Sequence, residues 1–123
     1  MVVGEFRLRK KKDFTSVFQN GWGKSNEYFL IKIKPNKEKL DRFGLVVSRN
    51  VDSKIVTRNK LKRRMREVVR KILKEKLTQG YDIVIVAKKE SKKATFQEID
   101  RGIRDLLKKL GILKNEKGYF KTY

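Results

Sequence analysis

The sequence contains no cysteine and no histidine, and it has a single proline. The absence of cysteine excludes disulfides and thiol nucleophiles, and the absence of histidine excludes imidazole acid–base chemistry. Zinc sites built from either residue are excluded as well. A magnesium site made of carboxylates alone stays open, but the acidic residues are scattered singly among lysine and arginine. Catalysis by side chains of this chain is therefore not expected.

Long apolar runs are also lacking. No segment has the length of a membrane-spanning helix, and the first residues contain no apolar stretch of signal-peptide length, so a cytoplasmic protein is expected. Acidic residues are scarce, because 14 Asp and Glu stand against 34 Lys and Arg, a formal charge of +20 over 123 residues. A compact chain with that excess repels itself, so we expect a polyanionic partner. RNA, DNA and an anionic membrane surface all fit this description.

Three segments have the apolar spacing of helices: residues 10–20, 57–77 and 95–110. The third opens with Thr95-Phe96-Gln97-Glu98, a capping-box pattern in which two side chains satisfy otherwise unpaired backbone donors. Each segment is followed by a glycine that can end a helix, namely Gly21, Gly80 and Gly111.

Residues 28–34 alternate between apolar and polar positions and are predicted to form a strand. A second strand is predicted over residues 43–48, pairing with the first as a hairpin. The unbroken apolar run 83–87 is typical of a central strand covered on both faces. The order helix, strand, strand, helix, strand, helix, with room for an extra short strand, predicts one small α+β domain over residues 1–111. Residues 112–123 have no usable period and are predicted to be a C-terminal extension, either ordered or a tail.

The second predicted helix has an excess of cations, with Glu67 and Glu75 as its acidic residues between Arg58 and Lys76. Salt bridges between neighbouring turns cannot account for that excess. At about 100° per residue, Arg58 and Lys62 fall inside the apolar sector of the helix and Arg66 falls on its border. Burial of unpaired charge is costly. This end of the helix must therefore overhang the sheet or line a groove that anions enter.

Phosphate binding is the functional interpretation of this helix, and a merely solvated charged face is the alternative. Cations one helical turn apart, about 5.4 Å, match the spacing of phosphates along a strand, and arginine adds bidentate recognition. The positive end of the helix dipole strengthens anion binding. Sulfate or phosphate is expected to occupy the same groove. The predicted RNA-binding residues are Arg58, Asn59, Lys60, Lys62, Arg63, Arg66 and Arg70.

The stretches 42–51 (RFGLVVSRNV) and 57–67 (TRNKLKRRMRE) resemble the signature of the bacterial ribonuclease P protein. That family pairs a glycine-containing strand ending in Val-x-Ser-Lys with a helix that begins Arg-Asn-Arg and continues Ile-Lys-Arg and Arg-Glu. The lysine-rich start, Asp13-Phe14 with Val17-Phe18, and Tyr81-Asp82 also fall where the family has them. The resemblance covers roughly residues 7–110.

Two departures from the family pattern are evident. Lys60 stands where the second Arg of Arg-Asn-Arg is usual, which keeps the charge but loses a bidentate fork. Residues 52–55 (DSKI) replace a more common glycine-containing turn. The path of the loop before the helix is therefore not predicted.

The resemblance implies an α+β sandwich with a left-handed β-α-β crossover, although the general rule favours right-handed crossovers. It implies that the chain is the accessory subunit of a ribonucleoprotein endonuclease that matures the 5′ end of tRNA. In this family the protein binds the catalytic RNA through the Arg-Asn-Arg region. It also contacts the 5′ leader of precursor tRNA in a cleft between the first helix and the sheet. Cleavage belongs to the RNA with its magnesium, and the protein has no catalytic residue or cofactor of its own.

Five residues match the predicted leader-binding cleft. Phe14 and Phe18 correspond to the aromatic pair of the family, and single-stranded nucleotides stack on aromatic rings. Lys32, Ser48 and Arg49 are the expected polar neighbours, with Lys32 at a position where the family often has an aromatic residue. The alternative is that this pair of phenylalanines on one helical face belongs to the core.

Three other functions stay open at this stage. A ribosomal or translation-associated RNA-binding protein could use the same architecture and basic helix. A DNA-binding protein could insert the helix into the major groove, although no helix-turn-helix partner is evident. A stand-alone nuclease is the third alternative.

Overall fold

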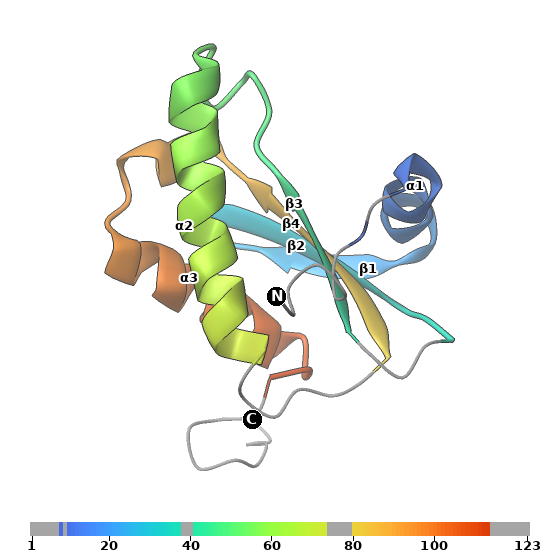
Figure 1. Cartoon of the computed structure of the whole chain (residues 1–123). Coiled ribbons are helices and arrows are strands. Elements are labelled where there is room, and N and C mark those ends of the chain that lie inside the picture. The colour runs from blue at the N-terminus through green and yellow to red at the C-terminus, as the bar shows by residue number, and fades with distance from the viewer. Residues whose placement is uncertain (1–7, 9, 38–40, 74–79, 114–123) are drawn as a thin grey trace.

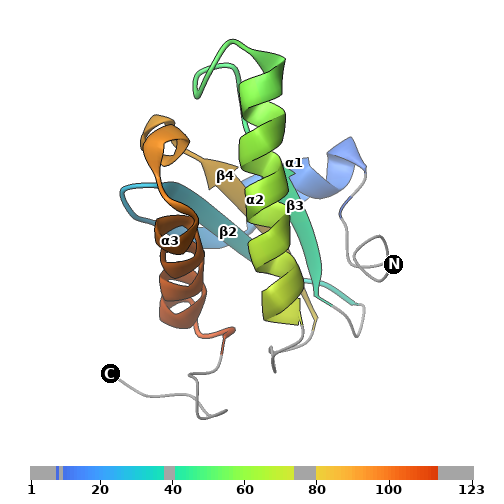
Figure 2. The ribbon, with the colours of Figure 1, turned by 60° about the vertical axis from the view of Figure 1, so that its left-hand side comes forward.

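The computed structural model describes residues 8, 10–37, 41–73 and 80–113. A four-stranded sheet carries α2 and α3 on one face and α1 on the other (Figures 1 and 2). The predicted α+β class is confirmed, and β1 is the extra short strand. In chain order the elements are α1 (Lys11–Asn20), β1 (Trp22–Ser25), β2 (Phe29–Pro35), β3 (Arg42–Val46), α2 (Ile55–Leu73), β4 (Tyr81–Ala87), the 3₁₀ helix η2 (Lys89–Lys93) and α3 (Phe96–Lys109).

The strands are not ordered as the sequence predicts. Their order is β1-β2-β4-β3, in which β2 pairs antiparallel with β1 and β4, and β3 pairs parallel with β4. The predicted hairpin between residues 28–34 and 43–48 is therefore wrong. A short polar connection suggests it, but β4 is apolar on both faces and takes the central position between β2 and β3, where α2 and α3 cover one face and α1 covers the other. The strands β3 and β4 with α2 form a parallel β-α-β unit, and the handedness of its crossover stays a prediction.

The two faces of β4 contribute to two separate apolar clusters. Ile83, Ile85 and Ala87 join the main core under α2 and α3. On the opposite face Val84 packs with Leu8 and with Val17 of α1. The predicted central strand, covered on both faces, is thereby confirmed. The alternation predicted for β2 is also confirmed, because Phe29, Ile31 and Ile33 are buried in the main core while the residues between them are partly exposed.

The predicted helix ends are largely as expected. The Gly21 N–H donates to the Val17 carbonyl at 2.9 Å and ends α1. The capping box of α3 is present, with Thr95 Oγ1 accepting from the Glu98 N–H at 3.1 Å and Glu98 Oε1 accepting from the Thr95 N–H at 2.8 Å. After α3, Gly111 adopts φ +80°, a left-handed conformation that glycine adopts without strain.

Helix α2 begins at Ile55, slightly before the predicted start at Thr57, and is described as far as Leu73. Its predicted continuation to Leu77 falls on residues 74–79, outside the described residues. After α3, Ile112 and Leu113 are buried in the main core, and the rest of the predicted extension, residues 114–123, also lies outside the described residues. Within the described ranges, no helix combines the length and the apolar character that crossing a bilayer requires.

Candidate nucleic-acid interface

Helix α2 packs on the sheet through one side, and its first turns extend beyond the ends of the strands (Figure 1). The residues of the packed side are Leu61, Met65, Val68, Val69 and Ile72, all buried. Arg58 and Lys62, which share the angular sector of these apolar residues, are only half-buried. The cationic end of the helix therefore overhangs the sheet, one of the two arrangements that the sequence predicts for charges in the apolar sector.

Arg58 holds the loop that precedes α2. Its Nη1 donates to the carbonyl of Asp52 at 3.1 Å and to the carbonyl of Ser53 at 2.9 Å. Loop carbonyls at this position would otherwise need water or another donor. One nitrogen of the guanidinium is thus occupied by the protein itself, and the side chain as a whole is half-buried.

Asp52 fixes the same loop from the other side. Its Oδ2 lies 2.8 Å from Lys92 Nζ in η2, and its Oδ1 accepts from the Lys54 N–H at 2.8 Å. The hydrogen bond from Lys92, followed by that from the Lys54 backbone, lowers the pKa of the Asp52 carboxyl. The departure from the family's glycine-containing turn is therefore accommodated by an aspartate that joins two segments distant in the sequence.

Four further cations of α2 have no acidic partner among the described residues. Lys60 and Arg63 are exposed, and Lys62 and Arg66 are half-buried. Among the residues that the structure describes, no acidic side chain forms an ion pair with any of these four. Unpaired cations on one element produce a local positive potential that attracts phosphates. The predicted Asn59 is also exposed and lies between Arg58 and Lys60.

Arg70 differs from the other predicted cations of α2. Its Nη1 lies 3.2 Å from Glu67 Oε2, and both side chains are partly exposed. An exposed ion pair of this kind adds little stability, but the carboxylate offsets part of the charge that a phosphate would meet. The positive surface is therefore strongest in the N-terminal half of the helix, between Arg58 and Arg66.

Phe14 is part of the structure on the α1 side of the sheet. It is half-buried and packs against the cluster of Leu8, Val17 and Val84. Its ring lies so close to Gly44 of β3 that a Cβ at that position would overlap it. Glycine is required there for α1 to approach the strand, so one predicted leader residue also has a packing role.

Phe18 lies one turn further along α1 and is 38% exposed. Lys32 Nζ donates to the Phe18 carbonyl at 3.3 Å, which brings these two predicted residues together. The neighbouring Lys34 donates to Ser16 Oγ at 2.6 Å and holds α1 on the sheet. Ser48 and Arg49 are exposed beyond the end of β3, in the loop that leads to α2. Of the predicted leader residues, the structure thus brings Phe18 and Lys32 into contact, while Ser48 and Arg49 lie in the loop before α2.

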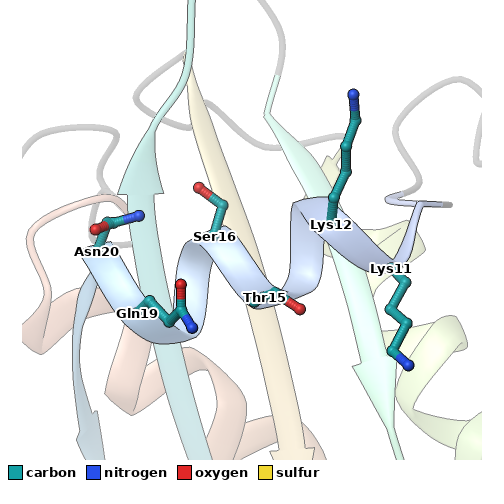
Figure 3. Close-up of a pocket in the computed structure, with 6 residues that line it drawn as sticks. All are labelled: Lys11, Lys12, Thr15, Ser16, Gln19 and Asn20. Carbon is teal, nitrogen blue, oxygen red and sulfur yellow. The ribbon is translucent and has the colours of Figure 1, made fainter.

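An open pocket of about 510 Å³ lies against α1 and was not predicted (Figure 3). Its described lining consists of Lys11, Lys12, Thr15, Ser16, Gln19 and Asn20, all from α1. These residues form a polar side of the helix beside the one that carries Phe14 and Phe18. The lysine-rich start of the sequence is the feature that indicates this polar surface. In the part of the chain that the structure describes, no three or more acidic side chains lie close enough together to hold a metal ion.

Comparison with known proteins decides between the functions left open by the sequence. The model of the ribonuclease P family matches residues 4–111. The chain belongs to the ribonuclease P protein family. The ribonuclease P protein component of Clostridioides difficile is 41% identical over 105 residues, covering 85% of this chain and 91% of the relative. That of Thermotoga petrophila is 37% identical over 108 residues, covering 85% and 91%.

Solved structures of the family have the same fold. The Staphylococcus aureus ribonuclease P protein matches with a TM-score of 0.80 at 28% identity, covering 89% of this chain and 98% of that one. The Thermotoga maritima protein matches with a TM-score of 0.75 at 34% identity, covering 84% and 96%. The family is that of the protein component of a ribonucleoprotein nuclease in tRNA processing. This assignment displaces the ribosomal, DNA-binding and stand-alone nuclease alternatives.

Proposed function

We propose that this chain binds the catalytic RNA of ribonuclease P through the cationic half of α2, and the 5′ leader of precursor tRNA on the α1 side of the sheet. The observation that carries the proposal is the set of cations that overhang the sheet without acidic partners among the described residues. In a family whose members serve a ribonucleoprotein, RNA phosphates are the natural counterions for such a surface. The same positions would hold sulfate or phosphate in the absence of RNA.

The leader site in this proposal uses Phe18 as the stacking surface. Phe18 is the more exposed of the two phenylalanines, and Lys32 beside it supplies a positive charge for the adjoining phosphate. Ser48 and Arg49 would continue the polar path toward α2. Aromatic rings with flanking cations bind single strands with little sequence preference, which suits a leader of variable sequence.

We assign the cleavage chemistry to the RNA subunit, together with magnesium held by the RNA. The chain has neither the imidazole, the most frequent general acid–base group, nor the thiol nucleophile, and its acidic residues are scattered among lysine and arginine. The contribution of the protein is then to neutralise phosphates and to position the substrate. This role places the chain in the cytoplasm with the tRNA precursors.

Reconstitution tests this proposal. The purified chain is added to a bacterial ribonuclease P RNA at a magnesium concentration at which the RNA alone cleaves slowly, and 5′ maturation of precursor tRNA is measured. We expect the chain to restore cleavage and to tighten binding of precursor tRNA more than binding of mature tRNA. Cleavage no faster than with the RNA alone would reject the proposal.

A further inference from the structure

Two large apolar side chains at the start of α2 have no cover from the rest of the fold. Ile55 is 61% exposed and Val56 is 76% exposed, more than any other large apolar side chain in the described part of the chain. Single exposed apolar residues are common on protein surfaces. Here two of them are adjacent, at a helix end that projects beyond the sheet (Figure 1). We refer to Ile55 and Val56 as the apolar tip.

The apolar tip is held in place by the loop before it. Arg58 donates to the carbonyls of Asp52 and Ser53, and the Asp52 carboxylate pairs with Lys92 of η2 at 2.8 Å. At about 100° per residue, Val56 points away from the side of α2 that packs on the sheet. The tip therefore cannot turn onto the core without breaking these contacts, and its exposure belongs to the folded state.

The charges around the tip identify the kind of partner that would cover it. Val56, Lys60 and Arg63 are spaced i, i+4 and i+7, so they lie along one side of the helix. Lys60 and Arg63 are exposed, and neither has an acidic partner among the described residues. A partner on this side must present anions next to an apolar face. An unpaired nucleotide does so, because its phosphate is charged and the faces of its base are apolar. A second copy of a chain of net charge +20 is repelled.

We propose that Ile55 and Val56 contact the bases of unpaired nucleotides in the catalytic RNA, while Lys60 and Arg63 bind the phosphates that follow. The inference rests on the proposed function, because it specifies which part of the RNA meets the start of α2. The two kinds of contact respond differently to salt. A cation that binds a phosphate releases counterions, whereas an apolar contact releases none, so its contribution to affinity is the same at every salt concentration.

The test uses the double variant Ile55→Thr with Val56→Thr, which keeps both side chains β-branched and replaces apolar groups by hydroxyls. Its affinity for a bacterial ribonuclease P RNA is measured over a series of salt concentrations. We expect binding to be roughly ten-fold weaker at every salt concentration, with the slope of log K against log salt unchanged. The matched control Lys60→Ala should instead reduce the slope by roughly 0.7 to 0.9. Both variants should keep the wild-type melting temperature, since the changed side chains are exposed.

Three outcomes would overturn the inference. One is wild-type affinity of the double variant throughout the salt series. Another is an equal loss of affinity for a fully paired RNA duplex, in which no base face is free. The last is a wild-type dimer in sedimentation velocity that the double variant abolishes, which would assign the tip to self-association. Failure of the wild-type chain to bind the catalytic RNA at any salt concentration would instead reject the proposed function, so the two failures are distinguishable.

Discussion

The two phenylalanines of α1 have different environments although they lie one helical turn apart. Phe14 packs against Gly44 and the small cluster on the α1 side, so its ring is part of the structure. Phe18 is 38% exposed, with Lys32 bonded to its carbonyl. Spacing alone predicts a pair on one face, and it cannot distinguish a ring that supports the helix from a ring that is free to stack.

Substitution of the two rings should therefore have different effects. Phe18→Ala should weaken binding of precursor tRNA by about 1–3 kcal/mol, the contribution of one stacked base, with little change in melting temperature. Phe14→Ala should lower the free energy of unfolding by about 3 kcal/mol, because it leaves a cavity beside Gly44. Affinities for precursor and mature tRNA, measured together with thermal unfolding, check both statements. Equal loss of affinity for both tRNA forms in Phe18→Ala would remove Phe18 from the leader site.

Asp41 is a buried acidic residue next to the start of β4. It is 5% exposed, and its Oδ1 accepts a hydrogen bond from the Tyr81 N–H at 2.8 Å. Burial, with a smaller effect from the nearby charge of Asp82, raises the pKa of Asp41 to about 6. Because the folded-state pKa lies above the unfolded value, the protonated form stabilises the fold, and that stability is lost as the pH rises through about 6.

The variant Asp41→Asn should remove this pH dependence, because an amide oxygen can keep the bond to Tyr81 without a charge. Above pH 7 the variant should be more stable than the wild type, by up to about 3 kcal/mol for a shift of this size. Near pH 4 the two proteins should unfold alike. Denaturant unfolding across this range measures the difference, and a constant difference at every pH would contradict the assignment to Asp41.

Helix α2 depends on the loop before it for its position. Arg58→Ala removes the donors to the carbonyls of Asp52 and Ser53, and we expect it to lower the free energy of unfolding by about 1–2 kcal/mol. It should also weaken RNA binding more than Lys60→Ala does, since the whole start of the helix can shift. Thermal unfolding and RNA affinity of the two variants check this. If the melting temperature of Arg58→Ala is unchanged, Arg58 does not stabilise the loop, and its only role is to bind phosphate.

At the scale of elements, features that depend on neighbours in the sequence could be predicted. The capping box of α3, the apolar side of α2 and the two-sided burial of β4 each follow from residues a few positions apart. The predicted hairpin between β2 and β3 is wrong, because strand order depends on contacts between distant segments: β4 lies between β2 and β3, where the helices on the two sides of the sheet cover both of its faces. The hydrogen bonds from Arg58 to the loop carbonyls cannot be predicted either, because the sequence does not determine the path of residues 52–55. Nor could the apolar tip be predicted, because the predicted helix begins at residue 57; extended back to residue 55, the helix has Val56 outside its apolar sector and Ile55 on the border.

The charge of the whole molecule leads to a further prediction. A net charge of +20 destabilises the compact state, and an anion that binds only the folded surface should stabilise it. Sulfate should raise the melting temperature above that in chloride at matched ionic strength. Because sulfate also stabilises proteins in general, the comparison is between two variants of equal charge, Lys60→Ala with Arg63→Ala on α2, and Lys108→Ala with Lys109→Ala on α3. The sulfate effect should be smaller in the α2 variant. An equal effect in both would count against a preformed anion site.

If the unpaired cations of α2 bind phosphates of the catalytic RNA, as we propose, the affinity must fall as salt rises, and measuring this dependence tests the proposal directly. For the wild type, log K should fall linearly with log salt, and the α2 double variant Lys60→Ala with Arg63→Ala should reduce the slope by about 1.5, for two lost phosphate contacts. The control Lys108→Ala with Lys109→Ala, which loses the same charge at the end of α3, should keep the wild-type slope. Equal slopes for the two double variants would contradict the account, because net charge rather than the surface of α2 would then determine binding.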